Sequence, residues 1–147
     1  MLRDLGPEPL SDSFSAASLD QALAGRRTPI KAALLDQKIV AGLGNIYVCE
    51  ALFFAGISPR RQAHTVQGGR AERLATAIRD VLRRAIAAGG SSLRDYVDAD
   101  GRKGSYVDLH QVYGRAGEPC VVCETILEGI QVAQRTTVFC PTCQGSR

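Results

Sequence analysis

The sequence has 147 residues, of which 45% are hydrophobic and 22% are charged. This is enough for one compact domain, and the composition excludes wholesale disorder. The apolar runs, such as 51–55 and 86–88, are far too short to span a bilayer, and the charged, proline-containing N-terminus does not resemble a secretory signal. We therefore expect a soluble, cytoplasmic protein with no membrane partner.

The net charge of +3 is unevenly distributed along the chain. Residues 1–25 carry a net charge of −3, residues 26–115 carry +7, and residues 116–147 carry −1. Fifteen of the 18 basic residues are Arg, whose guanidinium suits bidentate contacts with phosphate. Charge alone leaves two explanations open, a phosphate-binding surface and a bias in genomic base composition.

Start signals predict two short helices near the N-terminus. The segment 18–21 resembles a capping box that opens a helix ending at Gly25. Thr28 and Pro29 then predict a second start, with Thr28 as the N-cap and Pro29 in the first helical position. Apolar residues follow at helical intervals: Ile30, Ala33, Leu34 and Val40.

Two longer helices are predicted after this point. Glycines at 42 and 44 interrupt the chain, and Asn45 is the expected N-cap of a helix that runs through Phe54 and ends at Gly56. Its predicted apolar face consists of Ile46, Cys49, Leu52 and Phe53. The segment 70–88 is the clearest amphipathic helix, with a stripe formed by Leu74, Ile78, Val81, Leu82, Ala85 and Ile86.

The remainder of the chain is predicted to be a long polar loop and short strands. The polar segment 91–106 contains two glycines and is unusually long for a loop. A short strand is expected at 109–113. The alternating, β-branched segments 125–131 and 136–140 suit the two arms of a hairpin whose connection carries Arg135.

Four of the five cysteines form a metal-ligand pattern. Cys120 and Cys123 make one C-x2-C pair, and Cys140 and Cys143 make a second after sixteen intervening residues. This spacing is typical of a four-thiolate structural zinc site. A disulfide framework is disfavoured in a cytosolic chain, a rubredoxin-like iron site shares the same ligands, and a thioredoxin-like motif would not need two copies. Zinc is the interpretation that we favour, and Cys49 is expected only to pack.

These elements predict a mainly α fold with a small β zinc ribbon. The expected domains are residues 1–110, helical and including a loop at about 90–106, and residues 111–147, the zinc finger.

Several motifs together resemble the formamidopyrimidine-DNA glycosylases. They are DLGPEPLS near the start, GLGNIY at 42–47, the GGSSLRDYVDADG loop, YGRAGEPC and AQRTT. The resemblance implies a helix–two-turns–helix DNA-binding body followed by a finger with one structural Zn²⁺. It also implies a repair enzyme that excises oxidised purines (8-oxoguanine and formamidopyrimidines) from duplex DNA and cleaves the strand by β,δ-elimination. We expect the chain to be monomeric.

The resemblance assigns roles to particular residues. It implies DNA contacts from Arg26, Lys31, Asn45, Tyr47 and Arg135, and a role for Arg135 in δ-elimination. The loop that closes over the damaged base would contain Ser91, Ser92, Arg94 and Tyr96. Tyr47 is equally well explained by packing, and isolated charges are usually only solvated.

The start of the sequence departs from the family pattern. In similar enzymes the nucleophile is an N-terminal proline followed by a catalytic glutamate, whereas this sequence opens with Met1, Leu2 and Arg3. We therefore expect this chain to bind damaged DNA without excising a base. Three alternatives remain: an endonuclease VIII-like fragment for oxidised pyrimidines, a non-catalytic zinc-ribbon interaction module, and a truncated paralogue that only binds lesions.

Overall fold

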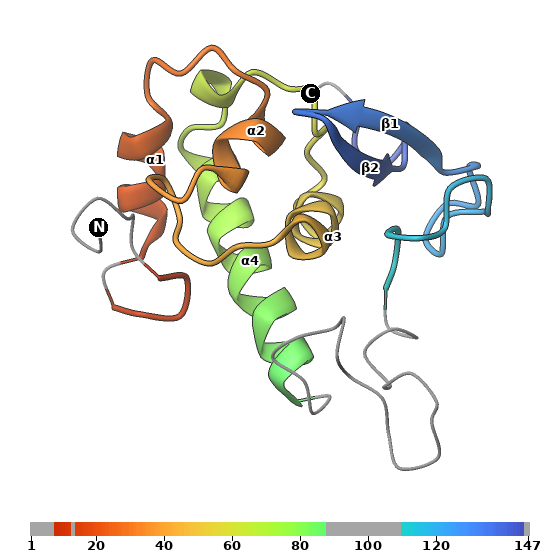
Figure 1. The fold of residues 1–147 in the computed structure, drawn as a ribbon, viewed down its shortest axis with the longest axis horizontal. Coiled ribbons are helices and arrows are strands. Elements are labelled where there is room, and N and C mark those ends of the chain that lie inside the picture. Colours follow the sequence, from red (N-terminus) through yellow and green to blue (C-terminus); the bar gives the residue numbers. More distant parts are fainter. Residues whose placement is uncertain (1–7, 13, 88–109, 146–147) are drawn as a thin grey trace.

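The computed structural model describes residues 8–12, 14–87 and 110–145 (Figure 1). The helices are α1 (Ala16–Leu23), α2 (Ile30–Leu35), α3 (Asn45–Ala55) and α4 (Gly69–Ala87), with a 3-10 turn, η2 (Ala63–Thr65), before α4. An antiparallel hairpin follows, formed by β1 (Glu128–Val132) and β2 (Arg135–Phe139). The mainly α fold class with a small hairpin is confirmed.

Two of the sequence predictions involve residues outside these described ranges. The loop with Ser91, Ser92, Arg94 and Tyr96 lies outside the described residues. The division into domains 1–110 and 111–147 stays a prediction.

Helix α1 begins three residues earlier than its sequence suggested. Ser15, not Ser18, is the N-cap: Ser18 N donates to Ser15 Oγ at 3.0 Å, and Ser15 N donates to Ser18 Oγ at 2.8 Å. The reciprocal pair is a capping box in which Ser18 takes the place usually held by Glu or Gln. The prediction of a box that starts at Ser18 is therefore wrong.

Helix α2 has no local cap, contrary to the prediction for Thr28. Pro29 occupies the N-cap position without a side-chain hydrogen bond. The first amides donate instead to a distant segment, Ile30 N to Arg61 O at 2.6 Å and Lys31 N to Pro59 O at 3.3 Å. Tertiary contact thus satisfies the donors that a capping side chain would otherwise take.

Helix α3 begins with Asn45 as its first helical residue, so the prediction of Asn45 as N-cap is wrong by one position. Gly44 is the N-cap and offers no side chain. The predicted end at Gly56 is confirmed, since that residue is left-handed with φ +72°. The turn before the helix contains Gly42 at φ +77°, a conformation that favours glycine.

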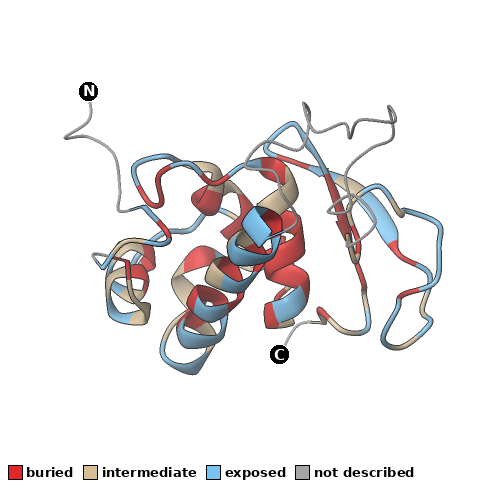
Figure 2. Ribbon diagram, turned by 90° about the horizontal axis from the view of Figure 1, so that it is seen from below, coloured by how far each residue is buried: buried red, intermediate tan, exposed pale blue. Residues whose placement is uncertain are grey.

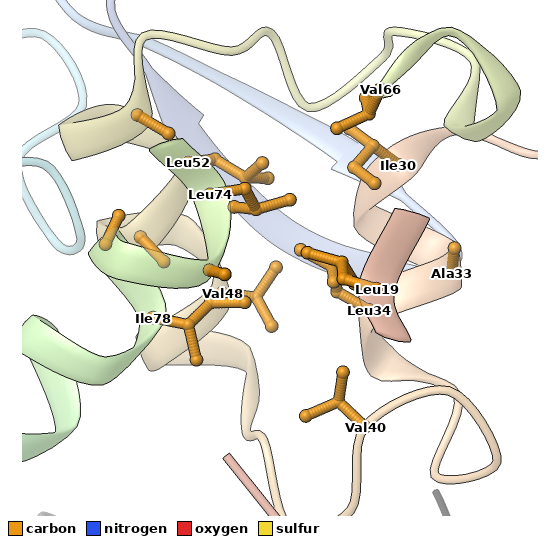
Figure 3. Close-up of a cluster of buried hydrophobic side chains, with 14 of the residues drawn as sticks. Leu19, Ile30, Ala33, Leu34, Val40, Val48, Leu52, Val66, Leu74 and Ile78 are labelled. Carbon is orange, nitrogen blue, oxygen red and sulfur yellow. The ribbon is translucent and has the colours of Figure 1, made fainter. Parts of the chain in front are cut away.

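A hydrophobic core fills the space between the four helices (Figure 3). Val48 and Leu52 of α3 meet Leu74 and Ile78 of α4, and Leu34 of α2 joins the cluster. On α4 the predicted stripe is buried at Leu74, Ile78, Val81 and Ala85, whereas Ile86 is 57% exposed, which corrects its assignment to the core.

Helix α3 is buried on almost every side (Figure 2). Cys49 and Phe53 point away from the first core and pack into a second cluster with residues of the C-terminal segment: Val112, Cys120, Leu127, Val138 and Cys140. The prediction of a single apolar face is therefore wrong. The helix is shared between the helical body and the finger.

The hairpin lies against this second side of α3 (Figure 1). Val132 pairs with Arg135, so the two-residue turn consists of Ala133 and Gln134, both with positive φ (+53° and +62°). This pattern matches type I′ hairpin turns, which usually contain Asn or Gly. Arg135 is the first residue of β2 rather than part of the connection.

The strand predicted at 109–113 is not present in the described part of that segment, 110–113. Its amides donate to a carboxylate, as described below. Among the described residues, no helix combines the length and the apolar character needed to cross a bilayer.

The packing of the core predicts a position-dependent cost along α4. Leu74→Ala should lower the free energy of unfolding by about 2–5 kcal/mol, because a fully buried side chain leaves a cavity. Ile86→Ala, on the same helix, should cost at most about 1 kcal/mol. Urea unfolding followed by circular dichroism measures both, and equal costs would contradict this arrangement of the core.

Candidate metal centre and nucleic-acid interface

The four cysteines of the two C-x2-C pairs converge on one point. The sulfurs of Cys120, Cys123, Cys140 and Cys143 all lie within 4.8 Å of one another. Individual separations are 3.9 Å for Cys120–Cys143, 3.4 Å for Cys123–Cys140 and 3.6 Å for Cys123–Cys143. A tetrahedral zinc ion with Zn–S bonds of about 2.3 Å requires sulfurs about 3.8 Å apart. The donor set therefore fits zinc.

The local backbone supports metal binding at these thiols. Val122 N donates to Cys120 Sγ at 3.4 Å, and Cys143 N donates to Cys140 Sγ at 3.2 Å. Hydrogen bonding with the Thr125 hydroxyl lowers the pKa of Cys123 to about 6, whereas burial raises the pKa of Cys140 and of Cys143. A divalent cation would stabilise all four sulfurs as thiolates. None of the five cysteines forms a disulfide bond, which agrees with a metal site at the four clustered thiols.

Gln144 fixes the second cysteine pair to the helical body. Its side chain, 1% exposed, accepts from Cys140 N at 2.8 Å and donates to Ile57 O at 3.0 Å. Ile57 directly follows the glycine that ends α3. One amide group thus connects the metal site to the C-terminal end of the shared helix.

Glu50 fixes the start of the finger. Its carboxylate is 1% exposed and accepts three backbone hydrogen bonds, from Gln111, Val112 and Tyr113 at 2.7–2.9 Å. Three amide donors thus satisfy much of the hydrogen-bonding capacity of this buried carboxylate. The segment before the first cysteine pair is thereby held on the middle of α3.

The hairpin tip is fixed by a third contact. The carbonyl of Thr136 accepts from Asn45 Nδ2 at 3.0 Å and from Lys31 Nζ at 3.1 Å. Lys31 also donates to Thr137 Oγ1 at 2.6 Å. Burial lowers the pKa of Lys31, and the nearby charge of Arg135 lowers it further, while Cys49 acts in the opposite direction. Burial also raises the pKa of the Cys49 thiol.

The structure brings together some of the predicted DNA-binding residues. Asn45 bonds to the residue that follows Arg135, so both stand at the junction of α3 and the hairpin tip. Arg135 is exposed there. Lys31 reaches the same junction but is 0% exposed, and its ammonium donates to the hairpin.

The other two predicted contacts have different surroundings. Arg26 follows α1 and approaches Asp36 at 3.9 Å, with the two side chains 44% and 38% exposed. Tyr47 packs partly buried against the helical core, and burial raises its pKa. Arg26 therefore lies beside the end of α2, and Tyr47 contributes to the core of the body.

Sequence reasoning missed four residues at this junction: Glu50, Thr136, Thr137 and Gln144. A carboxylate inside the apolar run IYVCEALFF was a usable signal for Glu50, because such a group needs partners when it is buried. For the threonines and Gln144 the sequence offers no comparable signal.

Comparison with known proteins identifies the class. Residues 5–97 match the model of the formamidopyrimidine-DNA glycosylase H2TH domain, and residues 117–145 match the zinc finger found in FPG and IleRS. Together with the cysteine geometry, these matches define an H2TH domain followed by a finger that binds one structural zinc.

Relatives place the chain in a family. It is 59% identical over 146 residues to a formamidopyrimidine-DNA glycosylase of Gluconobacter oxydans, and 61% identical over 147 residues to that of Rhodospirillum centenum. These alignments cover 98% and 96% of the chain, and 53% and 51% of the relatives.

Solved structures agree with this placement. The MutM (Fpg) protein of Thermus thermophilus matches with a TM-score of 0.88 at 47% identity, over 99% of this chain and 56% of that one. Lactococcus lactis Fpg, in a complex with DNA containing an abasic site, matches with a TM-score of 0.87 at 37% identity, over 99% and 53%. The chain belongs to the formamidopyrimidine-DNA glycosylase family, and it spans about half the length of these relatives.

The metal site predicts that replacing a clustered cysteine and replacing Cys49 have different effects on zinc content. Cys123→Ser should release the zinc and unfold the hairpin, because a finger this small has little core of its own. Cys49→Ser, the same change at a cysteine outside the cluster, should keep one zinc per chain. Metal analysis and circular dichroism measure both, and a hairpin that persists after zinc removal by a chelator would contradict the structural role.

The buried carboxylate of Glu50 predicts a loss of stability when its charge is removed. Glu50→Gln should lower the free energy of unfolding by about 2–3 kcal/mol, since an amide replaces the charge that three buried N–H groups require. Glu72→Gln, on the exposed side of α4, is the matched control and should have little effect. Urea unfolding measures the difference, and hydrogen exchange at 111–113 should accelerate only in the first variant.

Proposed function

We propose that this chain is the DNA-binding part of a bifunctional glycosylase and lyase that removes oxidised purines and cleaves the strand by β,δ-elimination. The observation that carries this proposal is the junction of Asn45 and Arg135 at the N-terminal end of α3. A side-chain amide, the helix N-terminus and a guanidinium together suit a DNA phosphate.

The start of α3 has the features of an anion site. Gly44 provides no capping side chain, and the first turn of the helix contains no acidic residue. The first amides, at Asn45 and Ile46, have no acceptor within the helix, so they can serve an external one at the positive end of eleven helical residues. Asn45 Nδ2 uses one hydrogen on Thr136 O and has a second for a phosphate oxygen.

Arg135 supplies the positive charge beside this site. It is exposed at the hairpin tip, and within residues 8–12, 14–87 and 110–145 no ion pair holds its guanidinium. In this proposal it enters the DNA duplex next to the damaged nucleotide. Because a guanidinium stays protonated at neutral pH, its role in δ-elimination is to stabilise charge on the leaving phosphate.

The remaining predicted residues have supporting roles in this proposal. Arg26 would contact a more distant phosphate through its exposed side chain. Tyr47 would pack below the site and offer its hydroxyl. Residues Ser91, Ser92, Arg94 and Tyr96 would act on the extruded base, which costs unstacking energy to expose.

The relatives are about twice as long as this chain. We propose that excision requires a protein that also contains the part of the relatives that this chain does not cover. Lactococcus lactis Fpg has been solved with DNA containing an abasic site, and a mutant of it with DNA containing Fapy-dG, which supports damaged DNA as the partner. We propose that the 147-residue polypeptide by itself binds such DNA as a monomer and releases no base, and that it works at the bacterial-type nucleoid in the cytoplasm.

Binding should be electrostatic and local to the junction. With about four to six phosphate contacts, log K should fall with log[salt] at a slope of about −4 to −5. Arg135→Ala and Asn45→Ala should each weaken binding to an abasic-site duplex by about tenfold, a loss of about 1.4 kcal/mol. Fluorescence anisotropy titrations at several salt concentrations measure both.

The control is Arg83→Ala, which removes an exposed arginine from α4. It should change affinity less than twofold. A zinc-ribbon interaction module would show no affinity for damaged duplexes even at low salt, and preference for an oxidised pyrimidine duplex would favour the endonuclease VIII alternative.

A further inference from the structure

Lys31 is a fully buried lysine whose ammonium reaches one strand. It is 0% exposed, and its ammonium donates to Thr136 O and to Thr137 Oγ1 of β2. Among the described residues no carboxylate forms an ion pair with it. A buried charge is costly, so a lysine in this position needs a role that an apolar side chain could not fill.

The hydroxyl of Thr137 extends the reach of Lys31 to the neighbouring peptide. Thr137 Oγ1 accepts from Lys31 at 2.6 Å and donates to the carbonyl of Arg135 at 3.0 Å. Lys31 therefore holds two consecutive carbonyls, that of Thr136 directly and that of Arg135 through Thr137. Fixing both carbonyls fixes the two peptide planes that follow Arg135 along β2, and the first of these carries the Cα of Arg135.

The hairpin tip needs such support. Ala133 and Gln134 are both left-handed, a conformation that is unfavourable for residues with a Cβ. Arg135 follows this turn at once and its side chain is exposed, so its local support is the pairing with Val132 across the turn rather than side-chain packing. The hydrogen bonds from α2 and α3 meet the strand one residue later, at Thr136.

We propose that Lys31 is a positioning residue, which holds the start of β2 so that the Arg135 guanidinium and Asn45 face the same DNA phosphates. This rests on the proposed function of Arg135. It replaces the direct phosphate contact that the sequence suggested for Lys31, because the ammonium is buried and engaged with the hairpin.

A double-mutant cycle tests this proposal on the zinc-loaded 147-residue chain. The four proteins are the wild type, Lys31→Met, Arg135→Ala and the combination, titrated with an abasic-site duplex by anisotropy at several salt concentrations. Positioning predicts that Arg135→Ala costs about tenfold in the wild type but less than twofold in the Lys31→Met background. Direct phosphate contacts from both residues would instead give multiplying losses and a salt slope reduced by about one for each.

Further variants distinguish a positioning role of Lys31 from an effect of its charge and from a loss of folding. Lys31→Gln keeps a donor without the charge, so it should bind more tightly than Lys31→Met. Lys38→Met removes an exposed lysine and should leave the Arg135 effect at about tenfold. If Lys31→Met loses zinc, Thr137→Val removes only the hydroxyl between Lys31 and Arg135, and it should reduce the Arg135 effect in the same way.

The outcomes distinguish the two proposals. If the wild type binds no DNA, or if Arg135→Ala has no effect on it, the proposed function fails and the positioning role fails with it. If Arg135→Ala costs about tenfold in every background, only the positioning role is overturned.

Discussion

The carbonyl of Thr136 receives hydrogen bonds from Asn45 of α3 and Lys31 of α2. This contact helps to set the direction of the hairpin relative to the helical body, because it attaches the strand beside the turn. A zinc centre alone makes the finger rigid but leaves its orientation free. Orientation matters when an exposed side chain must reach a groove within about an ångström.

Three polar contacts together define that orientation. Glu50 holds the start of the finger, Gln144 holds the second cysteine pair, and Asn45 with Lys31 holds the tip. The three attachments lie along the length of α3, and the apolar cluster around Phe53 fills the space between them. The thiolates therefore fix the internal shape of the finger, and the contacts with α3 fix its position on the helical body.

Regular patterns in the sequence predicted the elements but not their ends. The periodicity of α4 and the spacing of the cysteines both required only local information, so they could be recognised directly. The predictions of where helices begin were wrong where the first amides bond to a distant carbonyl or where an unusual residue completes the cap. Thr28 does not cap α2, because the first amides of that helix donate to Arg61 O and Pro59 O. Asn45 does not cap α3, because its side-chain amide donates to the hairpin.

The helical body, the hairpin and the four-sulfur metal site could all be predicted from local sequence, because hydrophobic period and ligand spacing are properties of neighbouring residues. The burial of α3 on two sides could not be predicted in this way, and neither could the contact of Lys31 with a strand more than a hundred residues away. Whether a buried donor is satisfied depends on which distant carbonyl the fold brings to it, and no local pattern encodes that partner.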